Sequence, residues 1–213
     1  MAFREMRVAY RQGELNERAA GANPIELFLS WIGTARGSGA ILEPNAMTLA
    51  TIGEDGAPVA RMVLLKEVED TGAFVFYTNR ESRKGRELEA TPRAALVFWW
   101  EPLERQVRIE GAVERTSDEE TRDYFDTRPR ESRIGAWASH QSQPIADRPA
   151  LERQFAEADA AHPGEEIPVP PWWGGYRVVP DRMEFWQGRL GRMHDRLVYV
   201  RDGTRWERSR LQP

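Results

Sequence analysis

Between residues 46 and 115 the sequence alternates short apolar stretches with tight turns, and this pattern constrains the fold more than any other feature. The stretches 46–52 and 58–66 flank Gly53-Glu-Asp-Gly56, a composition typical of a hairpin turn. Further strands are predicted at 73–78, 93–100 and 105–115. Because the connections leave little room for the crossover helices of a parallel sheet, the pattern predicts an antiparallel β-barrel.

Helices are predicted around this strand region, which makes the chain an α+β protein. Asn23-Pro24-Ile-Glu26 has the N-cap, N1 and N3 residues of a helix start, and Ser117-Asp-Glu-Glu120 is a capping box. Other helices are expected at 82–89, around Ile134 and Trp137, and at 149–161, and later strands at 175–179 and 182–186, with a last hairpin at Asp202-Gly203. We therefore expect a flexible arm over residues 1–22 and a single domain over 23–213.

The composition excludes several classes of protein. The chain has no cysteine, and its three histidines are dispersed, so we expect no metal site. The net charge of −4 argues against general nucleic-acid binding. No segment approaches the roughly 18 apolar residues of a membrane span, and the first residues are too charged for a signal peptide. We expect a cytoplasmic protein that binds neither nucleic acid nor membrane.

Near the C-terminal end, three ionisable side chains recur at alternate positions: Arg192, His194 and Arg196. In an extended segment this spacing places them on one face, with Met193 and Asp195 on the other. Like charges on one face repel, so the row is expected to face an anionic or electron-rich group. A solvated edge strand that carries arginines is the alternative for this stretch taken alone.

Several other cations occupy positions where an anion would fit. Arg61 and Lys66 end an apolar strand that we expect to be buried, where each charge needs a partner. Ser82-Arg83-Lys84 begins a short helix whose N–H groups and dipole favour phosphate, although an exposed helix start is commoner. All 30 cationic residues except Lys66 and Lys84 are arginine. A GC-rich genome explains this excess, and the two surviving lysines indicate sites that need a compact ammonium group.

Tyr124 and Arg128 are four residues apart, and Ser132 follows them. A phenol, a guanidinium and a hydroxyl suit a second phosphate, although the same spacing is common in ordinary surface packing. Gln106 and the pair Gln141-Ser142 supply neutral donors and acceptors that suit the edge of a flavin or a pyridine. The sequence contains no dinucleotide-binding, Walker or serine-hydrolase motif.

Seven motifs together resemble the pyridoxamine/pyridoxine 5′-phosphate oxidase family, and they follow one another in order between about Asn23 and Pro213. The resemblance implies an FMN-dependent homodimer with an FMN-binding split β-barrel of Greek-key type, peripheral helices, and FMN at the subunit interface. The motifs are Arg61-Met-Val-Leu-Leu-Lys66; Phe76-Tyr-Thr-Asn79 with Ser82-Arg-Lys84; Leu103-Glu-Arg-Gln-Val107; Tyr124-Phe125 with Arg128-Pro-Arg-Glu-Ser132; Ile134-Gly-Ala-Trp137 with Gln141-Ser142; Trp173-Gly-Gly175; and Glu184-Phe-Trp-Gln-Gly188 with Arg192-Met-His-Asp-Arg196.

The resemblance also implies roles for individual residues. Arg192 and His194 would be catalytic and lie over the pyridine ring of the substrate. Its phosphate would be held by Lys66, Tyr124, Arg128 and Ser132, with further substrate contacts from Arg7 and Tyr10 in the loosely matching arm. FMN would be held by Arg61, Met62, Val63, Leu64, Tyr77, Thr78, Arg83, Lys84, Gln106, Gln141, Ser142, Trp186 and Arg196, with Arg83 and Lys84 at its phosphate. Only Arg189-Leu-Gly191 departs from the family pattern in this last region.

The implied activity is the oxidation of pyridoxamine or pyridoxine 5′-phosphate to pyridoxal 5′-phosphate, a step of vitamin B6 metabolism. Hydride passes from the C4′ carbon to flavin N5, and dioxygen is reduced to hydrogen peroxide. The amine leaves an imine that water hydrolyses with release of ammonia. The alternatives are a flavin reductase of the same fold and a non-catalytic protein that binds flavin or pyridoxal phosphate.

Overall fold

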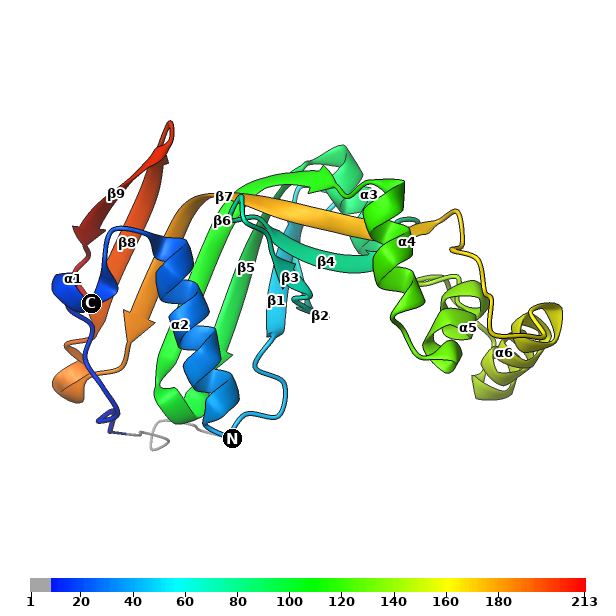
Figure 1. Ribbon diagram of the computed structural model, residues 1–213, viewed down its shortest axis with the longest axis horizontal. Helices are drawn as coiled ribbons and strands as arrows, with labels where there is room; N and C mark the ends of the chain where they lie inside the picture. Colours follow the sequence, from blue (N-terminus) through cyan, green and yellow to red (C-terminus); the bar gives the residue numbers. More distant parts are fainter. Residues whose placement is uncertain (1–8) are drawn as a thin grey trace.

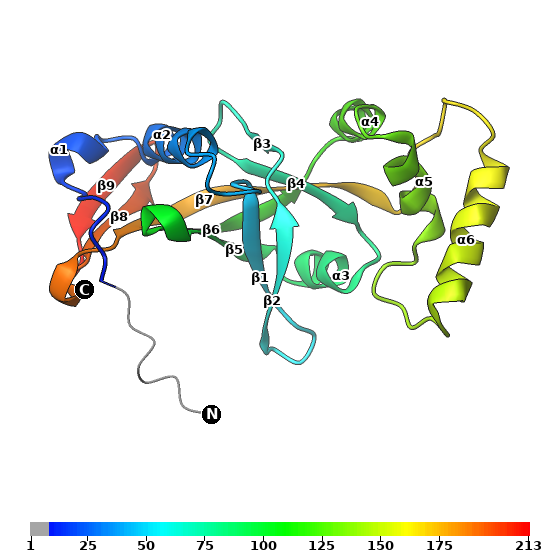
Figure 2. The same ribbon diagram turned by 90° about the horizontal axis from the view of Figure 1, so that it is seen from below.

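The computed structural model describes residues 9–213, whose strands form one nine-stranded antiparallel sheet. The sheet curls into a half-barrel, shown in Figures 1 and 2, and the antiparallel split barrel expected from the sequence is confirmed. Its order is β2-β1-β5-β6-β7-β4-β3, with β8 on β7 and β9 on β8. The strands are β1 (Ala46–Ile52), β2 (Pro58–Leu64), β3 (Glu67–Val68), β4 (Phe74–Asn79), β5 (Arg93–Trp100), β6 (Arg105–Arg115), β7 (Trp173–Gln187), β8 (Asp195–Asp202) and β9 (Arg205–Arg210).

The turn residues form the hairpins that the sequence predicts. Between β1 and β2, the Gly53 N–H donates to the carbonyl of Ala57 at 2.8 Å, and Gly56 has a φ of 78°, which glycine adopts without strain. β2 is an edge strand, and Met62 on it is 62% exposed. The expectation of a buried strand at 61–66 is therefore wrong for the single chain, because every residue of β2 is exposed or half-buried.

Strand β7 corrects a second prediction. Two strands were expected, at 175–179 and 182–186, yet β7 is one strand of 15 residues although it contains Pro180, which cannot donate a ladder hydrogen bond. A bulge accommodates the proline, since the register with β6 shifts between Glu110, opposite Arg182, and Gly111, opposite Pro180. The first half of β7 pairs with β4 and the second half with β8, so this one strand connects the β4 side of the sheet to the hairpin of β8 and β9 (Figure 1).

Each predicted helix forms. The side chain of Asn23 accepts from the Ile25 N–H at 3.0 Å. Ser82 caps the helix that begins at Arg83, and Ser117 with Glu120 forms the capping box of the helix that begins at Asp118. The helices are α1 (Glu17–Ala20), α2 (Pro24–Gly37), α3 (Arg83–Ala90), α4 (Asp118–Asp126), α5 (Arg130–Ala138) and α6 (Arg148–Ala161), with short 3₁₀ turns at Glu101–Leu103 and Leu190–Arg192. Within residues 9–213, no helix is both long and apolar enough to cross a membrane.

Two apolar clusters hold these elements together. In the larger one, Phe28 of α2 is fully buried against the sheet, 4.9 Å from the ring of Phe74 and 5.0 Å from that of Phe98. The smaller one joins Phe125 and Ile134 to Trp173 at the start of β7, and thereby attaches α4 and α5 to the barrel. Figure 2 shows these helices and α6 together at one end of the molecule.

The described part of the predicted N-terminal arm, residues 9–22, contacts the barrel. Leu15 and Ala20 belong to the larger core cluster, and the Leu15 N–H donates to the Asp195 carboxylate at 3.0 Å. Tyr199 donates its hydroxyl proton to the carbonyls of Ala20 and Gly21. The division at residue 22 stays a prediction.

Candidate functional site

A cleft of about 670 Å³ opens between the sheet edge and the helices α3, α4 and α5. It contains most of the predicted site residues, although they come from distant parts of the chain. This set is called the cleft group: Met62, Val63, Leu64, Lys66, Tyr77, Thr78, Lys84, Tyr124, Arg128, Ser132 and Gln141. Asn79, Thr127, Ser139 and Trp173, to which the sequence assigned no role, also line the cleft.

Three aromatic rings form one wall of the cleft. Tyr77 stacks on Tyr124 with ring centroids 4.1 Å apart, and on Trp173 at 5.5 Å. Burial, followed by the nearby Glu67 carboxylate, raises the pKa of Tyr77 to about 12, so its hydroxyl stays protonated. Trp173 could have been suspected from the sequence, since it follows a proline-rich connector and begins a strand that also contains predicted site residues.

Arg128 and Lys66 give the same cleft its positive charge. The guanidinium of Arg128 lies 4.8 Å above the Trp173 ring, and its buried Nη1 has no hydrogen-bond partner. Arg128 follows the end of α4, which corrects the prediction that it shares a helix face with Tyr124. The exposed ammonium of Lys66 lies 5.8 Å from the Tyr124 ring. A half-buried guanidinium with a buried, unused donor suits an anion.

Lys84 extends from the first turn of α3 into the cleft. Its ammonium donates to the Gln141 side-chain oxygen at 2.6 Å, to the Thr78 hydroxyl at 3.2 Å and to the Ser82 hydroxyl at 3.3 Å. These partners are all neutral. Burial, with a smaller effect from Arg61, therefore lowers the pKa of Lys84 to about 8. An anion beside this ammonium would supply the missing countercharge.

Arg61 and Arg83 are turned toward a buried carboxylate beside the cleft and do not line it. Glu87, whose side chain is 1% exposed, accepts from Arg61 at 2.5 Å and from Arg83 at 2.8 Å. Arg61 also donates to the Thr51 hydroxyl at 2.5 Å. The sequence analysis missed Glu87, although its position four residues after Arg83 on a helix is the spacing of an ion pair.

Six further predicted residues lie at the far end of β7. This set is called the strand-end group: Tyr10, Gln106, Trp186, Arg192, His194 and Arg196. The His194 ring is 4.6 Å from the Trp186 ring and 5.5 Å from that of Tyr10. The Arg189 N–H donates to His194 Nδ1 at 3.1 Å, so this nitrogen is the acceptor. Burial, and then the charge of Arg192, lower the pKa of His194.

The predicted row of Arg192, His194 and Arg196 on one strand face is wrong. The chain turns at Gly191 and Arg192, with φ of 65° and 62°, and β8 begins only at Asp195. Arg196 is instead paired with the buried Glu184 at 2.8 Å, and this pair removes the repulsion that the row would carry. Alternation in sequence therefore did not correspond to alternation in space.

The two groups lie far apart within one chain. Trp173 begins β7 beside the cleft, and Trp186 is next to the last residue of the same strand. A strand of 15 residues spans roughly 45 Å. In Figure 1, β7 runs from beside α4 to the turn before β8, and α5 and α6 lie beyond its first end. A single chain therefore does not bring the two groups into one site.

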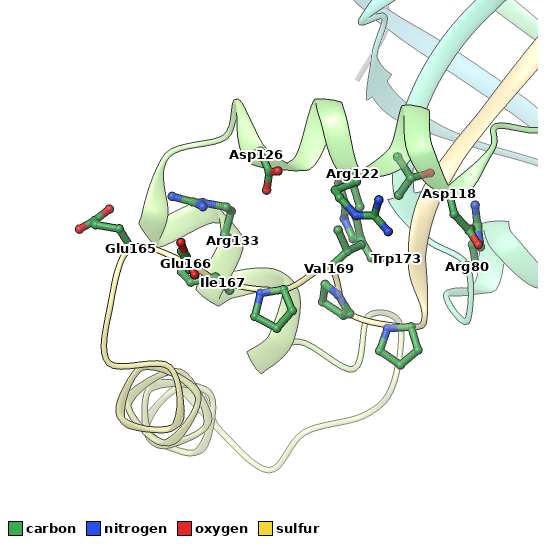
Figure 3. Close-up of a pocket in the computed structure, with 14 residues that line it drawn as sticks. Arg80, Asp118, Arg122, Asp126, Arg133, Glu165, Glu166, Ile167, Val169 and Trp173 are labelled. Atoms are coloured by element: carbon green, nitrogen blue, oxygen red, sulfur yellow. The ribbon is translucent and has the colours of Figure 1, made fainter.

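A larger hollow of about 940 Å³ lies on the other side of α4 and is shown in Figure 3. Arg133 and Asp126 lie at one side of it, and Arg80 and Asp118 at the other. Its lining mixes both signs of charge and includes no predicted site residue.

Apart from Arg61 and Arg83, two predicted site residues belong to neither group. Ser142 follows Gln141 with a φ of 74°, and Arg7 lies outside the described residues. In residues 9–213, no group of three acidic or histidine side chains could hold a metal ion.

Comparisons with known proteins agree with this division of the chain. The pattern of the family described as pyridoxamine 5′-phosphate oxidase matches residues 38–161. A second pattern, described as the pyridoxine 5′-phosphate oxidase C-terminal dimerisation region, matches residues 173–213. The second match covers β7, β8 and most of the strand-end group.

Relatives and solved structures cover nearly the whole chain. Pyridoxine/pyridoxamine 5′-phosphate oxidase from Thermosynechococcus vestitus is 56% identical over 209 residues, which are 98% of both chains. The protein of that name from Rubrobacter xylanophilus is 54% identical, over 98% of this chain and 95% of its own. The crystal structure of PhzG from Burkholderia lata 383, in complex with tetrahydrophenazine-1-carboxylic acid, has a TM-score of 0.86 at 35% identity, with 93% and 98% of the two chains covered.

Proposed function

The chain belongs to the pyridoxamine 5′-phosphate oxidase family, and from this premise we propose that it oxidises pyridoxamine and pyridoxine 5′-phosphates to pyridoxal 5′-phosphate, with FMN as cofactor and dioxygen as acceptor. The observation that carries the proposal is the identity of 56% over 98% of both chains with an oxidase of this name. The cleft supplies what such a substrate needs, because Arg128 has a buried donor without a partner and Lys84 has only neutral partners.

The residues around Lys84 fit FMN. When bound, FMN supplies the two-electron redox chemistry of the reaction. Lys84, with only neutral hydrogen-bond partners, would bind its phosphate, together with Thr78 and the first turn of α3. Arg61 and Arg83, which are both paired with Glu87, would help to bind the same end of the cofactor. Gln141 and Tyr77 would contact the rest of the cofactor.

The residues around Arg128 fit the phosphate of the substrate. Lys66, Tyr124, Ser132 and Arg128, whose Nη1 has no partner, all line the cleft. Arg128 is held on the Trp173 ring, so its donors are oriented before a ligand arrives. This arrangement favours substrates with a phosphate over those without one.

A second copy of the chain would complete the site. One chain separates the cleft group from the strand-end group by most of the length of β7, and the strand-end group lies largely in the segment that matches a dimerisation region. In a two-fold dimer, the strand-end group of each chain can meet the cleft group of the other. Both sites then use residues from both chains, and FMN lies at the subunit interface.

Arg192 and His194 would orient the pyridine ring of the substrate and exclude water from it. The hydrogen bond from the Arg189 N–H fixes Nδ1 of His194 as an acceptor, which leaves Nε2 of the neutral ring as a donor. The lowered pKa of His194 favours the neutral ring. Trp186 and Tyr10 hold it from the side.

Oxygen uptake tests the proposed function. The purified dimer, loaded with FMN, should consume dioxygen and form hydrogen peroxide with pyridoxamine 5′-phosphate, and should do so far more slowly with unphosphorylated pyridoxamine. A flavin reductase of the same fold would show no uptake with either amine but would oxidise a nicotinamide cofactor. Turnover by a colourless monomer would contradict the role of FMN and the shared site. The cytoplasmic location stays a prediction that cell fractionation tests.

A further inference from the structure

Four residues form a continuous row across the outer face of the sheet near the end of β7. Trp99 of β5 pairs with Gln106 of β6, Gln106 with Trp186 of β7, and Trp186 with Arg196 of β8. Residues that are directly opposite in adjacent strands point to the same side of a sheet. The four side chains therefore share one face.

The opposite face of the same strands is the core. Phe98 precedes Trp99, and Phe185 precedes Trp186. Val107 follows Gln106, and Leu197 follows Arg196. All four of these neighbours are fully buried. The row of four is consequently directed away from the core of its own chain. In the shared site described above, this is the face that meets the cleft group of the second chain.

Trp99 is the member of the row to which neither the motifs nor the comparisons assign a role. It is 46% exposed, and its ring centroid lies 5.9 Å from that of Trp186. The next residue, Trp100, is 1% exposed and donates its indole N–H to the Pro44 carbonyl at 2.9 Å. Trp100 is thus a core residue, whereas Trp99 presents a large aromatic surface beside Trp186.

We propose that Trp99 is a further cofactor-binding residue, which forms with Trp186 an aromatic wall against the flavin ring held in the cleft of the second chain. The inference rests on the proposed function, because it requires FMN at the subunit interface. A flavin ring is flat and aromatic, and an indole beside it buries apolar area and adds a favourable ring contact. Half-exposed in the single chain, Trp99 would lose this exposure in the complete site.

Titration of the flavin-stripped dimer with FMN, followed by flavin fluorescence, tests the proposal. Trp99→Ala should raise the Kd for FMN about five- to tenfold. Trp99→Phe should bind within about twofold of the wild type, since it keeps a ring. Val97→Ala is the matched control, because Val97 lies two residues earlier on the same strand and face, in a row with Arg108 and Glu184. It should bind FMN as the wild type does.

Sedimentation of each variant establishes that the dimer is intact. If Trp99→Ala does not dimerise, Trp99→Leu replaces it, because leucine keeps apolar area at the interface but has no ring. A raised Kd for Trp99→Leu together with a normal Kd for Trp99→Phe supports the proposal. Equal Kd values for the wild type, Trp99→Leu and Trp99→Phe overturn it. A wild-type protein that binds no FMN would instead refute the proposed function, which separates the two failures.

Discussion

Lys84 and Gln141, 57 residues apart in the chain, are joined by a hydrogen bond of 2.6 Å across the cleft. Gln141 shares this role with Thr78, which Lys84 contacts at 3.2 Å, so the ammonium is oriented by neutral groups alone. Such an arrangement fixes the position of the charge without cancelling it. The affinity for an anionic ligand should consequently depend on whether Lys84 carries its proton.

The first prediction concerns FMN binding and pH. Burial, and then Arg61, lower the pKa of Lys84 to about 8 in the free protein, and a bound phosphate dianion should raise it again. Binding then takes up a proton above pH 8, so affinity should fall as pH rises, by up to about tenfold per pH unit. The phosphate itself is already a dianion above pH 7. The measurement is the Kd for FMN between pH 6.5 and 9.5.

A Lys84→Arg variant is the control for this prediction, because its guanidinium stays protonated throughout the range. Its Kd, whatever its absolute value, should vary little with pH. A wild-type Kd that is equally flat would show that FMN does not use the Lys84 ammonium.

The second prediction concerns Glu87, which joins Arg61, Arg83 and Thr51 in a buried network. Burial alone would raise its pKa, but hydrogen bonds from Thr51 and Arg61 hold the pKa below its ordinary value. Its stabilising effect is therefore present above the ordinary carboxyl pKa and is lost as pH falls through the lowered one. Glu87→Gln should reduce the free energy of unfolding at pH 7 by about 2 kcal/mol, measured by urea denaturation.

Glu54→Gln is the matched comparison for Glu87→Gln, since the side chain of Glu54 is 78% exposed and lies 3.7 Å from Arg86. This surface pair should contribute less than about 0.5 kcal/mol. The free energy of unfolding of Glu87→Gln should also fall less than that of the wild type when the pH is lowered from 7 into the acid range, because the variant has no carboxylate at this position. Equal effects of the two substitutions would argue that the network contributes nothing beyond a surface pair.

The third prediction concerns Arg192 and His194. Both would contact the pyridine ring of the substrate and not FMN, so Arg192→Ala and His194→Ala should keep their FMN content. Each should lower kcat/KM for pyridoxamine 5′-phosphate by about tenfold or more, on the order of 1.4 kcal/mol. Stopped-flow reduction of the flavin by substrate measures the affected step. Full activity of the double variant would exclude both residues from the reaction.

The fourth prediction concerns Lys66, whose ammonium lies over Tyr124. Lys66→Arg keeps the charge, but the wider guanidinium should displace the substrate phosphate or crowd the Tyr124 ring. KM for pyridoxamine 5′-phosphate should rise about tenfold, roughly 1.4 kcal/mol, with FMN binding nearly unchanged. Pyridoxamine without its phosphate should be a poor substrate of both forms, and the variant should lose little more on it. Wild-type KM in the variant would mean that charge alone matters here.

Local signals in the sequence predicted the elements well because each had a nearby physical cause. The caps at Asn23, Ser82 and Ser117 satisfy backbone donors within three residues, and such caps can be recognised without knowing the fold. The bounds of β1, β5 and β6 follow from turn residues in the same way. Turn residues could not predict that β7 is a single strand, because the bulge that accommodates Pro180 depends on the pairing of β7 with β6.

The contacts within the site were harder to predict than the residues that belong to it. The resemblance to a known family named residues of both groups, and the cleft indeed gathers eleven of them. It did not reveal Glu87, whose role depends on two arginines from different elements, or the alignment of Trp99 with Trp186, which depends on the register of three strands. The alternating row at residues 192–196 failed because one turn with positive φ at Gly191 and Arg192 destroys a period of two.

The length of β7 also has a genetic consequence. A chain that carries Arg128→Ala has a damaged cleft, and a chain that carries both Arg192→Ala and His194→Ala has a damaged strand end, so neither forms a working site with its own kind. When the two are expressed together, the proposed shared site gives each mixed dimer one site with every defect and one site with none. Random pairing makes half of the dimers mixed, so about one quarter of all sites should regain wild-type activity. Two inactive alleles of this gene should therefore complement each other inside one cell.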